Sequence, residues 1–138
     1  MKASVLLDTC AALWIAQNAP MRPEAVAAID EAFDRGEKIR LSPIIGWEIG
    51  LLASNGRFKS STSPQRWLER LLGRPQIMLA ELPPEVLLAS SFLPGTPPKD
   101  PADRIIVATA REYGLTVMTR DRSLLAYANE GYLNAVEC

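Results

Sequence analysis

The residues of this chain best suited to chemistry are acids at the borders of apolar segments. Asp8 ends the run ASVLL, and Asp121 follows the run LTVMT after a single arginine. Glu48 lies in an unusually apolar stretch, and Asp103 closes the tetrapeptide DPAD. Clustered carboxylates repel one another and resist ionisation unless a cation neutralises them. If the four acids meet in the folded chain, a hard divalent cation is their natural partner.

Local helix chemistry offers a simpler explanation for the same acids. Asp8 and Asp121 each precede a segment with helical character, where an aspartate is a good N-cap. In DPAD, residues 100–103, an N-cap aspartate, a proline in the first helical turn and an acid near the helix dipole would also occur together. Glu48 could lie on a solvated helix face. Local helix chemistry explains each acid by itself. The occurrence of acids at two strand ends is the observation that favours a shared metal-binding site.

Other common catalytic groups are missing from the sequence. The chain has no histidine, which excludes histidine triads, histidine bases and histidine metal ligands. Cys10 and Cys138 form neither a disulfide scaffold nor a metal cluster by their spacing, and a reducing cytoplasm is their simplest location. Asp8 comes too early for a signal peptide, and no apolar run approaches the length of a membrane span. We therefore expect a cytoplasmic protein whose chemistry depends on oxygen ligands.

Short apolar segments alternate with helical ones along the 138 residues. Strands are predicted at 3–7, 38–42, 77–82, 115–119 and 133–136, and helices at 9–16, 23–35, 44–54, 63–72, 84–92, 101–113 and 123–130. This alternation predicts one α/β domain over residues 1–138, with three α/β/α layers and a central, mostly parallel sheet of about five short strands covered by helices on both faces. Ligands bind such sheets at the carboxyl ends of the strands, where Asp8 and Asp121 fall.

The basic residues are unevenly distributed, although 15 of them nearly balance 16 acids. Residues 57–75 hold five basic residues and one acid. For Arg66, Arg70 and Arg74, a solvated helix face and an RNA contact are equally good explanations. Arg104, Arg120 and Arg122 adjoin the acids and are better candidates for holding a phosphate backbone. Trp67 could stack on a base, but a tryptophan in an amphipathic helix is more often part of the core.

Four motifs occur in an order that resembles the PIN-domain family, and within it the VapC-type toxin ribonucleases of toxin-antitoxin pairs. They are LLDT at 6–9, WEIGLL at 47–52, DPADRIIVATA at 100–110 and VMTRDRSLLAY at 117–127, which together span nearly the whole chain. The resemblance implies a PIN-like version of the predicted fold. It assigns catalysis and metal binding to Asp8, Glu48, Asp103 and Asp121, and supporting roles to Thr9, Asp100 and Thr119. An acidic pocket needs basic groups around it to hold RNA, and we expect these contacts from Lys99, Arg104, Arg120 and Arg122.

The activity that this resemblance implies is Mg²⁺- or Mn²⁺-dependent endoribonuclease cleavage by the toxin of a type II toxin-antitoxin system. Its partners would be an RNA substrate, a cognate antitoxin and a second copy in a homodimer, with no membrane. A catalytically silent PIN-like scaffold that binds RNA or protein, and a DNA nuclease with the same acids, remain as alternatives. A receiver-like signalling domain is disfavoured, because ASVLLD lacks an acidic pair and the last strand does not end on a lysine.

Overall fold

A five-stranded sheet forms the centre of the molecule in the computed structural model, which describes residues 4–138. All strand pairs are parallel, and the strand order is β3-β2-β1-β4-β5. The strands are β1 (Val5–Leu7), β2 (Ile39–Leu41), β3 (Ile77–Leu79), β4 (Thr116–Thr119) and β5 (Asn134–Glu137). The chain order reverses at β1, which lies between β2 and β4. In open α/β sheets such a reversal opens a crevice at the carboxyl ends of the strands.

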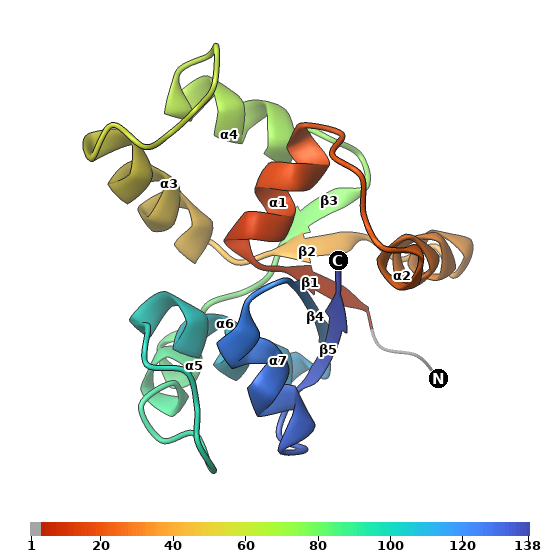
Figure 1. Ribbon diagram of the computed structural model, residues 1–138, viewed down its shortest axis with the longest axis vertical. Helices are drawn as coiled ribbons and strands as arrows, with labels where there is room; N and C mark the ends of the chain where they lie inside the picture. The colour runs from red at the N-terminus through yellow and green to blue at the C-terminus, as the bar shows by residue number, and fades with distance from the viewer. Residues whose placement is uncertain (1–3) are drawn as a thin grey trace.

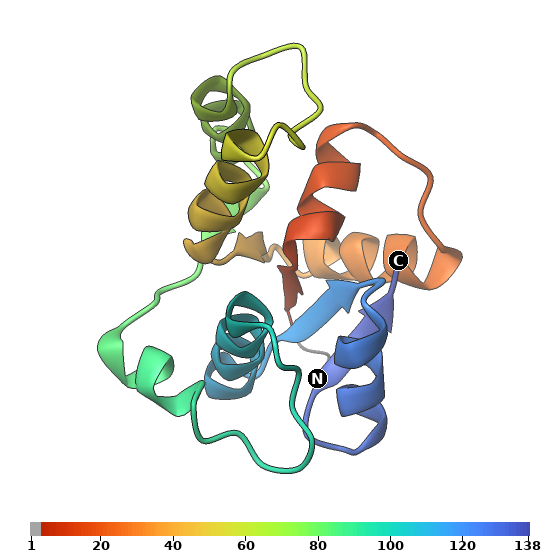
Figure 2. The same cartoon turned by 60° about the vertical axis from the view of Figure 1, so that its left-hand side comes forward.

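Within residues 4–138, seven helices cover the two faces of this sheet. They are α1 (Thr9–Ala16), α2 (Pro23–Asp34), α3 (Ile44–Ser54), α4 (Pro64–Leu72), α5 (Pro84–Ala89), α6 (Pro101–Tyr113) and α7 (Arg122–Asn129). Figure 1 shows α1 and α2 on one side of the sheet and α6 and α7 on the other, and Figure 2 shows the same layers from a second direction. The predicted three-layer α/β/α fold with a parallel sheet is therefore confirmed.

The central strand β1 contributes side chains to the hydrophobic core on both faces of the sheet. Val5 and Leu7 pack with α1, α2 and α4, whereas Leu6 packs with α6 and α7 on the opposite face. All three side chains are at most 2% exposed. A strand buried on both faces needs an uninterrupted apolar sequence, and this explains the run that precedes Asp8.

The predicted elements differ from the observed ones mainly at their ends. The first four strands are shorter than predicted, and the fifth has the predicted length but begins and ends one residue later. Ala3, the first residue of the first predicted strand, lies outside the described residues. The helix predicted over 84–92 ends at Ala89. The Ser90 hydroxyl donates to the Leu87 carbonyl at 2.6 Å, and Arg104 Nε donates to the Ser90 carbonyl at 2.9 Å. The second of these bonds comes from a distant helix, so the sequence around Ser90 does not reveal it.

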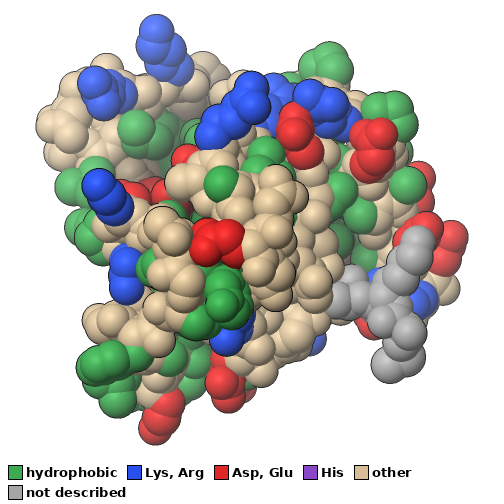
Figure 3. All heavy atoms as spheres, turned by 60° about the horizontal axis from the view of Figure 1, so that its bottom comes forward, with side chains coloured by type: hydrophobic (Ala, Val, Ile, Leu, Met, Phe, Trp, Pro, Cys, Tyr) green, Lys and Arg blue, Asp and Glu red, His purple; other side chains and the backbone are tan. Residues whose placement is uncertain are grey.

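Within residues 4–138, none of the helices combines the length and apolar character that crossing a bilayer requires. Basic and acidic side chains are interspersed on the face shown in Figure 3, with hydrophobic groups between them. This mixture agrees with the net charge of -1. Any electrostatic preference for a ligand must therefore come from local groups of residues and not from the molecule as a whole.

Replacing a leucine of β1 should destabilise the fold far more than replacing one of the edge strand. Leu6 is 0% exposed, whereas Leu79 on β3 is 44% exposed. We expect Leu6→Ala to lower the free energy of unfolding by about 2–5 kcal/mol, because it removes buried surface and leaves a cavity. Leu79→Ala serves as the matched control and should cost less than about 1 kcal/mol. Urea unfolding followed by circular dichroism measures both, and equal losses would contradict the central position of Leu6.

Candidate active site

The four predicted acids lie around one edge of the sheet. Asp8 follows β1 directly, and Asp121 comes two residues after β4. Glu48 is on α3, which follows β2. Because β2, β1 and β4 are neighbours, their carboxyl ends bring these three acids to the same edge. Asp103 joins them from the first turn of α6, a helix that packs against both α3 and β4.

Asp8 is held from two sides. Its Oδ1 accepts a hydrogen bond from the Ala11 N–H at 2.8 Å, which caps α1, and its Oδ2 accepts one from the Thr119 hydroxyl. The side chain is only 4% exposed. Burial raises the pKa of Asp8 above its usual value, the two hydrogen bonds oppose this rise, and repulsion by Asp121 adds to it. Asp8 is therefore both a helix cap and a carboxylate whose ionisation is less favourable in the folded protein than in water.

Two threonine hydroxyls connect the acids to the framework. The Thr119 hydroxyl donates to Asp8 and accepts the Asp121 N–H at 2.9 Å, so it joins the ends of β1 and β4. The Thr9 hydroxyl donates to Glu48 Oε1 and so connects α1 to α3. Both threonines are buried. The hydrogen bonds place Thr9 and Thr119 beside the acids, and their supporting roles stay predictions.

The capping explanation also holds for Asp100 and Asp121. Asp100 Oδ2 accepts the Asp103 N–H at 3.0 Å at the start of α6. Asp121 Oδ1 accepts the backbone N–H groups of Ser123 and Leu124, at 2.8 and 3.1 Å, and the Ser123 hydroxyl at 2.5 Å. In each carboxylate the other oxygen has no hydrogen-bond partner among residues 4–138. Capping thus fixes the side chains and leaves one oxygen of each available to a ligand.

Asp103 is the acid whose negative charge is least offset by hydrogen-bond donors. Burial and then repulsion by Asp100, Asp121, Glu48 and Asp8 raise its pKa to about 7. Its carboxylate accepts no hydrogen bond from the part of the chain that the structure describes. Burial likewise raises the pKa of Glu48, against the hydrogen bond from Thr9 and with repulsion from Asp100 and Asp8. The acids therefore share one electrostatic environment.

Cys10 lies in the same environment, although its sequence position gave no reason to single it out. Burial and then repulsion by the four predicted acids raise the pKa of its thiol to about 11. The thiol form is therefore favoured at neutral pH, which makes Cys10 a poor nucleophile. Ser123 was also not predicted, and the signal that identifies it is an Asp-x-Ser sequence at a helix start.

The chemistry of these side chains fits a hard divalent cation. The acids offer only oxygen donors, and a cation would reverse the raised pKa values of Asp8, Glu48 and Asp103. As they stand, no three Cys, Asp or Glu side chains among residues 4–138 form a group that could enclose an ion. Mg²⁺ keeps several of its waters and needs only one or two carboxylates, so its binding does not require all four acids as direct ligands.

The four basic residues predicted to contact RNA fall into two pairs. Lys99 and Arg122 are exposed and have no hydrogen bond or ion pair within residues 4–138. Arg104 donates to the carbonyls of Ser90 and Pro98, at 2.9 and 3.1 Å. Arg120 donates to the carbonyls of Cys138 and Pro20, and its guanidinium carbon lies 3.3 Å from the ring centroid of Trp14. The second pair therefore stabilises loops, and all four RNA contacts stay predictions.

The chain resembles known proteins over almost its full length. Residues 5–130 match the family model described as PIN domain. The chain is 31% identical over 124 residues to Ribonuclease VapC22 of Mycobacterium tuberculosis, covering 90% of this chain and 92% of the relative.

Two solved structures show the same fold at lower identity. A chain in the structure of VapBC2 from Rickettsia felis, bound to a DNA fragment from their promoter, has a TM-score of 0.64 at 13% identity and covers 96% of this chain and 97% of its own length. A chain of FitAcB from Neisseria gonorrhoeae has a TM-score of 0.56 at 22% identity, with 95% of each chain covered. At these identities, the likeness concerns the fold alone.

Removing the charge of Asp103 should stabilise the cation-free protein at high pH. The carboxyl pKa is 3.8 in the unfolded chain and about 7 in the folded one, so between these values the folded chain binds more protons. The stability that this proton uptake provides is complete below pH 3.8 and is lost as the pH rises through about 7. Above about 7 we expect Asp103→Asn to unfold at a higher temperature than the parent, by about 4 °C for about 1 kcal/mol.

This difference should shrink as the pH is lowered from about 7 toward 3.8, because the parent then binds its proton. Asp30→Asn, at an exposed position of α2, is the matched control and should show no such dependence. Thermal unfolding with EDTA across this pH range is the measurement. A pH-independent difference would mean that Asp103 is not in the repulsive environment described above.

Proposed function

Because this chain belongs to the PIN-domain family and has a VapC ribonuclease among its relatives, we propose that it is a metal-dependent endoribonuclease, the toxin of a type II toxin-antitoxin pair. The observation that carries this proposal is the position of Asp103, whose ionisation Asp8, Glu48, Asp100 and Asp121 all oppose. A fold gains nothing from such an arrangement unless a cation binds there. Hydrolysis of a phosphodiester is the chemistry for which a hard cation among carboxylates is suited.

The cation would be held by Asp8 and Asp103, with Glu48 and Asp121 contributing directly or through water. When bound, Mg²⁺ or Mn²⁺ lowers the pKa of a coordinated water and offsets negative charge at the scissile phosphate. The protein supplies the positions of the oxygen ligands. Thr119 fixes one oxygen of Asp8, Thr9 fixes one oxygen of Glu48, and the helix amides at the start of α7 fix Asp121. Polar groups that orient metal ligands in this way commonly contribute a factor of about 10–100.

A silent scaffold that binds RNA or protein is the alternative to this proposal. The complete set of acids argues against it, because a scaffold has no need to keep buried carboxylates with raised pKa values. The choice of RNA over DNA rests on the resemblance to a ribonuclease, since the metal chemistry serves either phosphodiester. An RNA-cleaving toxin also fits the cytoplasmic location expected from the sequence.

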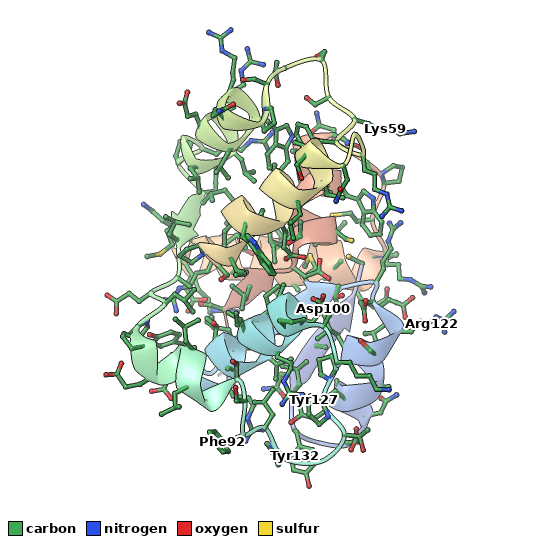
Figure 4. All side chains as sticks on the ribbon, turned by 90° about the vertical axis from the view of Figure 1, so that its left-hand side faces the viewer. Lys59, Phe92, Asp100, Arg122, Tyr127 and Tyr132 are labelled. Atoms are coloured by element: carbon green, nitrogen blue, oxygen red, sulfur yellow. The ribbon has the colours of Figure 1, made fainter. Side chains whose placement is uncertain are left out.

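Protein partners are the second part of the proposal. Four large apolar side chains are strongly exposed near α3 and α5, with exposed fractions of 51% for Trp47, 43% for Leu51, 67% for Leu88 and 78% for Phe92. Figure 1 shows α3 and α5 on the same side of the molecule, and Figure 4 shows Phe92 pointing outward. Exposed apolar groups of this size favour a protein interface. A second copy of the chain and a cognate antitoxin are the partners that we propose.

The first experiment asks whether the acids cleave RNA. The purified, partner-free protein is incubated with structured and single-stranded RNA in Mg²⁺, in Mn²⁺ and in EDTA, beside Asp8→Asn. We expect cleavage only with a divalent cation, and a loss of at least about a hundredfold in the variant, because even groups that merely support a metal ligand cost about 10–100-fold. Asparagine keeps the cap of α1, so circular dichroism should find the variant folded. Undiminished cleavage by the folded variant would remove Asp8 from the catalytic set.

A second experiment isolates the Thr119 hydroxyl. Thr119→Val keeps the shape of a buried side chain but removes the donor to Asp8, and we expect cleavage to fall about 10–100-fold and to require more Mg²⁺. Thr109→Val is the matched control, since Thr109 is also 0% exposed and its hydroxyl donates only to the Ile105 carbonyl, at 2.8 Å. Equal cleavage and equal Mg²⁺ requirement in the two variants would show that the Thr119 hydroxyl does not position Asp8.

A further inference from the structure

We propose that a basic cavity between the end of α1, the loop before α4 and α4 itself binds the phosphate backbone of the RNA beyond the cleavage site. This inference rests on the proposed function and names where its substrate is held. The cavity has a volume of about 640 Å³. Its lining includes the side chains of Lys59, Ser60, Ser61, Thr62, Arg70 and Arg74, which we call the basic cavity.

The charges of the basic cavity are uncompensated. No carboxylate within residues 4–138 pairs with Lys59, Arg70 or Arg74, and no acid lines the cavity. The lining also holds three hydroxyl groups, of which those of Ser60 and Thr62 are hydrogen-bonded to each other at 3.1 Å. Lysine, arginine and hydroxyl side chains are the groups that proteins use to hold phosphate oxygens.

The floor of the basic cavity indicates that it takes the backbone and not a base. Trp67 is only 8% exposed, and its ring meets that of Phe58 edge-on at a centroid distance of 5.7 Å. The indole is therefore committed to the core and offers no free face for stacking, which settles the earlier alternatives for Trp67 in favour of the core. Contacts limited to phosphates bind without reading sequence, so this cavity would add affinity without selecting a cleavage sequence.

The two ends of α1 connect the basic cavity to the acids. Thr9, in the first turn of α1, donates to Glu48, whereas Ala16 and Gln17 at its other end line the cavity. Eight helical residues rise about 11 Å, which corresponds to about three nucleotides of a stacked strand. Figure 4 shows Lys59 and Arg122 toward the same edge of the molecule, with Asp100 nearer the middle of the view. A single strand lying along this side would thus reach both sites.

An RNA substrate needs such a second contact because the acids repel its backbone. Two of the four residues predicted to contact RNA beside the acids, Arg104 and Arg120, are hydrogen-bonded to backbone carbonyls of the protein itself. Only Lys99 and Arg122 remain unengaged there among the residues predicted to contact RNA. An acidic segment of a protein partner is the competing occupant. The polar lining favours the RNA, because a protein segment would also bring apolar side chains to bury.

The test measures RNA binding without cleavage, in the Asp8→Asn background. Fluorescence anisotropy follows a labelled, mixed-sequence single-stranded RNA of roughly 12 nucleotides over a range of salt concentrations. Arg70→Gln with Arg74→Gln empties two positions of the basic cavity. We expect affinity to fall about tenfold, and the slope of log K against log salt to fall by about 1.4, which is about 0.7 for each lost phosphate contact.

The matched control replaces Arg57 and Arg66, two exposed basic residues of the same segment that do not line the cavity, so we expect a solvated surface and not an RNA contact for them. Arg57→Gln with Arg66→Gln removes the same charge and should change affinity by less than about threefold. Equal losses in the two double variants would overturn the inference, because net charge alone would then explain binding. An unchanged RNA affinity in the cavity variant would overturn it as well. Loss of binding to a polyglutamate peptide in that case would assign the cavity to an acidic protein partner.

Cleavage separates this inference from the proposed function. The cavity substitutions are also made in the cleavage-competent protein, and RNA is supplied at concentrations too low for saturation. Slower cleavage by this variant than by the control variant supports the inference. Equal cleavage by both would overturn the RNA-binding cavity and leave the ribonuclease intact. A parent protein that neither binds nor cleaves RNA would overturn the proposed function, and the inference with it.

Discussion

Mutual repulsion among half-buried carboxylates is the constraint around which the carboxyl edge of the sheet is built. Burial and neighbouring acids raise the pKa values of Asp8, Glu48 and Asp103 together, so their ionisation opposes folding at neutral pH. The fold offsets this with donors that it places locally, namely the Thr119 and Thr9 hydroxyls and the helix amides. Asp103 carries most of the repulsion that these donors do not offset, and a cation would therefore be stabilised most beside it.

Helix capping and site chemistry are not competing explanations in this molecule. Each cap uses one carboxylate oxygen of Asp100 or Asp121 and fixes the direction of the other. A capped aspartate loses few further degrees of freedom when it binds a ligand, because the helix start already restricts its side chain. The same bond therefore stabilises a helix and orients a potential ligand. Asp8 is the most strongly oriented of these acids, because the helix cap and the Thr119 hydroxyl together engage both of its carboxylate oxygens.

Sequence patterns predicted the layers, the parallel sheet and the position of each element, because periodicity and turn residues act over a few residues at a time. They also brought Asp8 and Asp121 to one edge through the rule that parallel strands end together, whereas only the family resemblance added Glu48 to them. Such local patterns could not predict interactions between segments that are distant in the sequence. Nothing near Arg104 or Arg120 in the sequence indicates that their guanidinium groups bind carbonyls of Ser90, Pro98, Pro20 and Cys138. The basic cavity likewise needs α1 and α4 side by side, and only the folded chain provides that.

The contacts of Arg120 have a consequence for how the molecule fluctuates. One guanidinium holds the carbonyl of Pro20 after α1, the carbonyl of Cys138 after β5 and the ring of Trp14 on α1. Opening of any of these segments breaks part of the same set of contacts, so the three share much of their opening free energy. We therefore expect amide hydrogens near Pro20 and Cys138 to exchange as one cooperative unit, although more than a hundred residues of chain separate them.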